Sequence, residues 1–185
     1  MYKVLDKDTI EMEIVPNIPM ARRGFPPRVE LSEIVNAVLY KMKTGVQWEY
    51  LPVTALFAQR ALTWQGVYYH FRKWCLSGTF YRCWTSILEK YRDRLDLSSV
   101  DLDGSHTPAK RGGEDVQYQG RKKSKTTNAL YLTDRQGLPL AMSQPVEGNH
   151  NDLYEIEVQF EVVTATLENS RIDIGGAVSQ RRCGF

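Results

Sequence analysis

Two acidic side chains, Asp101 and Asp103, lie two residues apart in a segment where Val100 and Leu102 alternate with them. In a β-strand, residues i and i+2 project from the same face, so the two carboxylates would be neighbours. A carboxylate at a strand end beside a glycine is well placed to hold Mg²⁺, which binds one or two carboxylates together with phosphate oxygens. The pattern is also compatible with a solvated edge strand that enters a turn at Asp103-Gly104.

Basic side chains follow the acidic segment in two groups separated by glycines, Lys110 and Arg111 first, then Arg121, Lys122, Lys123 and Lys125. A flexible, glycine-rich, basic stretch is suited to follow a phosphate backbone, although it could also be an ordinary solvated loop. Its nearness to the acids favours the first interpretation, because a nuclease-type site needs metal-holding acids and phosphate-holding bases around one substrate. We expect these residues to contact DNA.

Other candidate side chains have less specific patterns. His106 could act as a catalytic base, but a lone histidine in a turn more often has a structural role. The segment Gly148–Asp152 is expected to be a capped helix start. Helical spacing predicts that most of the tryptophans are buried in a core, with base stacking as the alternative use; they are Trp48, Trp64, Trp74 and Trp84.

The first half of the chain predicts a helical unit. Apolar residues recur with helical spacing from Leu31 to Met42, in a helix that Gly45 should end. A second helix is expected over about Thr63–Leu76, with Arg72 and Lys73 among its outer, DNA-contacting positions, and a third after the N-cap Thr79. Residues 1–30 are rich in proline and predict an irregular lead-in that could include a short strand.

The second half predicts the opening of an α/β domain. Near Leu97 the period becomes alternating, and two strands, 129–132 and 138–142, are separated by the turn-forming run Asp134–Gly137. A helix capped by Asn151 or Asp152 should then carry the apolar positions 153, 156, 160, 163 and 167. The expected class is α+β, a helical domain followed by the start of an α/β domain.

Bulk composition sets limits on size and partners. At 185 residues there is room for one ordinary domain, or a small one plus part of another, and the net charge of +2 is too small to indicate a partner. The three cysteines lack metal-ligand spacing, which favours a reducing cytoplasm over a disulfide framework or a zinc site. No signal peptide or membrane span is evident, so we expect a soluble cytoplasmic protein.

Several segments, in order, resemble the insertion-sequence-five group of bacterial DDE-class transposases. The likeness covers about residues 27–170, and the ordered set of motifs is more specific than any single one. The matching segments are 39–48, 51–52 and 67–74 in the helical half, then Asp103–Thr107, Arg121–Thr127, Gly137–Leu140 and Glu147–Asp152.

The resemblance implies a ribonuclease-H-like catalytic core that holds two divalent ions, expected to be Mg²⁺, through a DDE triad and cuts and rejoins DNA at element ends. Asp103 matches the first acid, and Asp101 is a lesser candidate. The implied partner is the DNA of the terminal repeats, homo-oligomers are compatible with it, and no membrane is involved. The implied divisions are a lead-in (1–30), a DNA-binding helical domain (31–95), the start of the catalytic domain (96–174) and a tail (175–185).

The departures from the family are equally informative. Its second acid, in a strand of the type Asn-Ala-Asp-Ala-Gly-Phe, and its glutamate are both absent. We therefore expect a truncated, inactive version that binds DNA without transposing it. With suitable synonymous codons, residues 177–185 encode Leu-Phe-Leu-Asn-Ala-Asp-Ala-Gly in another frame, which suggests an out-of-frame tail without a packed role. The alternatives are a helix-turn-helix regulator without catalysis and a decayed gene product.

Overall fold

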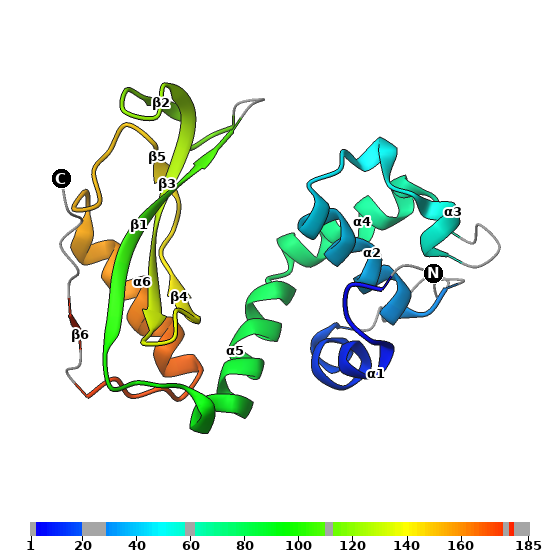
Figure 1. Ribbon diagram of the computed structural model, residues 1–185, viewed down its shortest axis with the longest axis horizontal. Coiled ribbons are helices and arrows are strands. Elements are labelled where there is room, and N and C mark those ends of the chain that lie inside the picture. Colours follow the sequence, from blue (N-terminus) through cyan, green and yellow to red (C-terminus); the bar gives the residue numbers. More distant parts are fainter. Residues whose placement is uncertain (1–2, 20–28, 58–61, 110–112, 176–177, 180–185) are drawn as a thin grey trace. The chain divides into compact units, whose positions relative to one another are not determined.

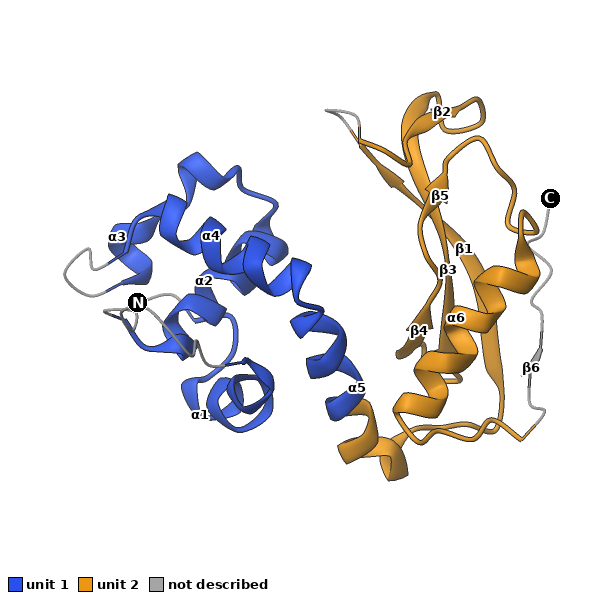
Figure 2. Cartoon of the chain, turned by 180° about the vertical axis from the view of Figure 1, so that it is seen from behind, with its two compact units in different colours: residues 1–87 blue, residues 88–185 orange. Residues whose placement is uncertain are grey.

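The computed structural model of the chain describes residues 3–19, 29–57, 62–109, 113–175 and 178–179. The chain divides into two compact units, residues 1–87 and 88–185 (Figures 1 and 2). The first is helical and the second carries the sheet, which confirms the α+β class. The division falls inside one helix, α5 (Thr79–Tyr91), a few residues before the boundary that the sequence suggested.

The expectation of an irregular lead-in is wrong over residues 7–17, which are helical. A short helix α1 (Lys7–Thr9) continues into a π-helical segment (Ile10–Ile14) and a 3₁₀ turn (Val15–Asn17). The side chain of Asp6 accepts a hydrogen bond from the Thr9 amide at 2.8 Å, which caps the start. No proline precedes Pro16, so nothing interrupts this first stretch. Residues 20–28 lie outside the described residues.

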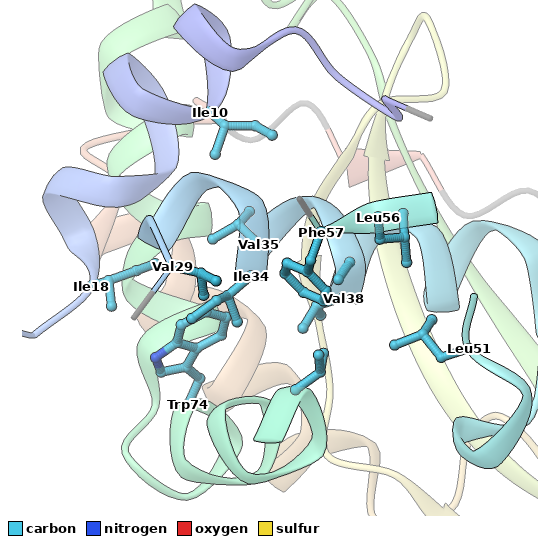
Figure 3. Close-up of a cluster of buried hydrophobic side chains, with 12 residues drawn as sticks. Ile10, Ile18, Val29, Ile34, Val35, Val38, Leu51, Leu56, Phe57 and Trp74 are labelled. Carbon is cyan, nitrogen blue, oxygen red and sulfur yellow. The ribbon is translucent and has the colours of Figure 1, made fainter. Parts of the chain in front are cut away.

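Helix α2 (Leu31–Thr44) forms the centre of the first unit, as predicted, and ends at Gly45, which has a left-handed φ of 68°. Its buried side packs in a core with residues from the N-terminal turns, from α3 (Val53–Leu56) and from α4 (Trp64–Leu76) (Figure 3). Met42, expected on the buried stripe, is instead 62% exposed, because the core does not extend to the last turn of the helix.

Helix α4 begins as predicted, with the Thr63 side chain accepting a hydrogen bond from the Gly66 amide. The apolar pattern predicts that the buried side carries Val67, Tyr68, Phe71 and either Trp74 or Cys75. Val67 and Trp74 are buried, whereas Tyr68 and Cys75 are exposed. The buried stripe is therefore narrower than the apolar pattern suggested. Of the tryptophans, Trp74 is a core residue, while the other three are partly buried.

The second unit is built on a sheet around two long antiparallel strands, β1 (Val100–Pro108) and β3 (Ser124–Asp134). Strand β4 (Pro139–Met142) pairs with β3 through the predicted turn, in which the Asp134 carboxylate accepts hydrogen bonds from two backbone amides. Strands β2 (Gln117–Gln119) and β5 (Val146–Glu147) pair with the opposite end of β3.

A further strand, β6 (Val178–Ser179), runs parallel to β1 and pairs with it at Val100 and Asp101. The expectation that residues after Gly175 have no packed role is wrong for this backbone segment, because β1 offers an unpaired edge there. The resulting strand order is β2-β3-β1-β6, with β4 and β5 also on β3. Arg181, Arg182 and Cys183 lie outside the described residues, and the frameshift stays a prediction.

Helix α6 (Ile156–Asn169) follows the sheet (Figure 2). Its buried residues include Gln159, Val163 and Leu167. It starts later than predicted, and neither Asn151 nor Asp152 caps it; Glu155, with a left-handed φ of 48°, precedes its first turn. Leu153 and Phe160, predicted to be buried, are 64% and 37% exposed. In the described part of the chain, no helix has the length and apolar character needed to cross a membrane.

Candidate functional site

The two acids lie on one face of β1, as the alternation predicted. Val100 and Leu102 are buried on the opposite face, at 0% and 9% exposure, while Asp101 is half-buried and Asp103 exposed. Asp103 is not at the strand end, however. Residues 104–108 continue to pair with β3, so Asp103 lies in the interior of a strand flanked by β3 and β6, opposite Tyr131.

The second group of the basic segment lies in a tight turn between two strands. Arg121, Lys122 and Lys123 occupy the turn between β2 and β3, and Lys125 already belongs to β3. The turn closes through a hydrogen bond from the Lys123 amide to the Gly120 carbonyl, with Lys123 at a left-handed φ of 48°. Lys110 and Arg111 lie outside the described residues.

Gln119 attaches this basic turn to the rest of the sheet. Its Oε1 accepts a hydrogen bond from the Arg121 amide at 3.3 Å, and its Nε2 donates to the Gly148 carbonyl at 3.0 Å. Gly148 itself packs directly on β3, since a β-carbon there would lie 2.0 Å from Thr126 Oγ1. These contacts attach the backbone of the turn to β3 and to the segment that contains Gly148.

The acids and the bases do not form a single compact cluster. The register of β3 places Lys125 and Tyr131 on the same face, and Asp103 lies opposite Tyr131. At the rise of an antiparallel strand, Lys125 and Tyr131 are roughly 20 Å apart. An extended ligand could contact both regions, but a small molecule could not.

The Mg²⁺ expected on this face stays a prediction. Asp101 and Asp103 are about 7 Å apart along the strand by the strand repeat, and Mg²⁺ accepts one or two carboxylates when phosphate and water complete its shell. Within the described ranges, no three His, Cys, Asp or Glu side chains come together to hold a metal ion. Asp101 and Asp103 alone would supply two carboxylate ligands.

His106 lies on the opposite face of β1 from Asp103, because it is an odd number of residues away. Its Nδ1 is 3.2 Å from Thr126 Oγ1 on the neighbouring strand. This placement separates its ring from the two acids and gives it a partner in the sheet, in line with the structural role.

Sequence reasoning missed one polar contact on the buried face of the sheet. Asn128, which is 2% exposed, donates from Nδ2 to Asp152 Oδ1 at 2.9 Å. The same carboxylate fills the space beside Gly104, where a β-carbon would lie 2.1 Å from Asp152 Oδ1. A glycine inside a strand often marks such a close approach, so Gly104 was the signal that could have indicated this contact.

In the first unit, α4 presents Arg72 and Lys73 on its exposed side, beside Tyr69, which is 62% exposed. His70 is half-buried, with its ring 5.7 Å from that of Trp74. Burial, and secondarily the nearby Lys73 ammonium, lower the pKa of His70 below its usual value. The lowered pKa favours the neutral form of His70, and Arg72 and Lys73 supply positive charge on this surface.

Residues 12–84 match a family model described as "Putative transposase of IS4/5 family". The matched stretch runs from the N-terminal turns through α2 and α4 into α5, and ends before the sheet begins. No curated protein and no solved structure shows a significant match to the chain.

Proposed function

We propose that this chain, whose residues 12–84 match the IS4/5 transposase family model, binds DNA at insertion-sequence ends and carries the first acid of a DDE catalytic site. The family match over the helical unit is the observation that carries this proposal. In it, α4 contacts DNA through Arg72 and Lys73, and the sheet unit is the start of the catalytic domain.

The arrangement of the sheet unit supports its part in this proposal. Three antiparallel strands, β4, β3 and β1, are followed by α6, and the chain then returns as β6 parallel to β1. A helical crossover between parallel neighbours is typical of α/β domains. Asp103 therefore lies in a central strand, where a ribonuclease-H-like core would hold its first carboxylate.

Mg²⁺ bound at Asp103 and Asp101 would polarise a phosphate oxygen of the DNA. The side chains of this chain do the rest of the positioning. The Arg121–Lys125 turn holds the phosphate backbone by charge, and Gln119 holds the turn in place.

The experiment is a salt titration of binding to duplex DNA, followed by fluorescence anisotropy. For the full chain, log affinity should fall linearly with log salt, by about 0.9 per phosphate neutralised. Replacing Arg121, Lys122, Lys123 and Lys125 by alanine should lower both the affinity and this slope. Arg135→Ala is the matched control, since Arg135 lies in the turn at the other end of β3 and should leave the slope unchanged.

Three results separate the proposal from its alternatives. If the full chain does not bind duplex DNA at low salt, the proposed function is wrong. If binding is lost only in the Arg72→Ala, Lys73→Ala double variant and never in the turn variant, the helix-turn-helix regulator accounts better for the protein. We expect that both variants lose affinity for DNA, because the proposed transposase contacts DNA through two regions.

A further inference from the structure

An exposed aromatic ring lies at the far end of the face that carries Asp101 and Asp103. Tyr118, the middle residue of β2, is 57% exposed and lies directly opposite Lys125 of β3. Residues that face each other across an antiparallel pair project to the same side of the sheet. Tyr118 and Lys125 are therefore neighbours on one face.

The register of β1 and β3 extends this face to the acids. Thr107 lies opposite Thr127, Ser105 opposite Ala129 and Asp103 opposite Tyr131. Alternation places all of these residues on the side of Lys125, away from the buried Leu102 and Leu132. The face thus runs from an aromatic ring and a lysine, past small hydroxyl side chains, to two carboxylates.

We propose that this face binds an unpaired DNA strand, with Tyr118 stacked on a base and Lys125 on the adjacent phosphate. This inference rests on the proposed function and adds the kind of DNA that the sheet recognises. An aromatic ring stacks on the flat side of any base, and sequence-independent binding of single strands combines such rings with cations along the backbone. In a duplex, neighbouring base pairs cover those flat sides.

The surroundings of Tyr118 favour this ligand over others. Its hairpin also carries Arg121, Lys122 and Lys123, which are all exposed, so the ring is close in sequence and in the fold to a group of cations. The cations lie at the hairpin end of this face, so the hairpin is the part that holds the strand. Gln119, the residue after Tyr118, attaches this hairpin to the sheet through hydrogen bonds to the Arg121 amide and the Gly148 carbonyl.

The test compares wild-type chain, Tyr118→Phe and Tyr118→Ala for binding to a short oligothymidylate and to a duplex of equal length, over a range of salt. Tyr118→Ala should bind the single strand about 5- to 150-fold more weakly, the effect expected for loss of one base–aromatic stack. Its salt slope should match wild type, because no charge is removed. Tyr118→Phe keeps the ring and should bind like wild type.

Two further variants test the role of Lys125 and provide a control for the loss of an aromatic ring. Lys125→Ala should lower the single-strand salt slope by about 0.7, one phosphate contact, which Tyr118→Ala should not do. Tyr154→Ala is the control, since Tyr154 is an exposed aromatic of the same unit whose ring stacks on His150 instead. Circular dichroism melts verify that each variant is folded.

The inference is overturned if Tyr118→Ala binds oligothymidylate as tightly as wild type, or if it loses equal affinity for the duplex. Wild-type binding to the duplex, together with no effect of Tyr118→Ala on the single strand, would leave the proposed function intact and reject only this inference. Absence of wild-type binding to either DNA would reject both.

Discussion

The carboxylate of Asp152 occupies the space that a side chain at position 104 would need. A β-carbon on Gly104 would lie 2.1 Å from Asp152 Oδ1, far inside van der Waals contact, and the same oxygen accepts the Asn128 hydrogen bond. Gly104 directly follows Asp103 on β1. The glycine beside the candidate acid is therefore explained by a contact from the segment before α6, and not by a turn.

The first prediction tests this contact. Gly104→Ala should lower the free energy of unfolding by about 1–3 kcal/mol, the usual cost of overpacking a filled site. In an Asp152→Ala background the same change should cost clearly less, because the space is then free. Chemical denaturation of the four proteins measures the coupling. Gly120→Ala is the control, since a β-carbon there meets nothing within 4 Å. An equal cost in both backgrounds would contradict the packing described here.

The second prediction concerns Asp103. In NMR titrations with Mn²⁺, we expect weak, saturable broadening of backbone signals around Asp103 and its neighbour Tyr131, because two carboxylates attract a divalent ion. Asp103→Asn should abolish the effect, whereas Asp115→Asn, which changes another exposed carboxylate of the same unit, should preserve it. Broadening that persists in Asp103→Asn would remove this residue from the metal site.

The third prediction is a pH dependence from His70. Its folded-state pKa lies below the usual value because burial, and then Lys73, disfavour the charged ring. The unfolded chain therefore binds this proton more readily, so the stability from neutral His70 is present above about pH 6.5 and is lost as the pH falls below that value. In thermal melts, the melting temperature should fall less between pH 7.5 and pH 5.5 for His70→Gln than for wild type. An identical fall in melting temperature for both proteins would contradict this role of His70.

The fourth prediction concerns the start of α4, which holds Arg72 and Lys73. Thr63→Ala removes the side-chain acceptor of the Gly66 amide and should cost about 0.5–2 kcal/mol of stability. Thr63→Ser keeps the hydroxyl and should be close to wild type. Urea denaturation compares them; a loss of the same size in both variants would show that the methyl group, rather than the cap, is responsible.

Local patterns in the sequence determined much of the element order. The helix over Leu31–Thr44, its end at Gly45 and the cap at Thr63 all depend on residues within one or two turns of each other, so their spacing is sufficient to predict them. The same is true of the turn at Asp134–Gly137 and of the shared face of Asp101 and Asp103, which follows from the two-residue repeat of a strand.

Tertiary structure alone decided which of these residues meet. Strand pairing joins residues far apart in the chain, and no local repeat specifies it. Only the register of β3 brings Lys125 and Tyr118 onto the face of Asp103, and the pairing of β2 with β3 places the expected loop in a turn between these two strands. The close approach of Asp152 to Gly104 is decided in the same way, because the path of the chain before α6 carries that carboxylate onto β1.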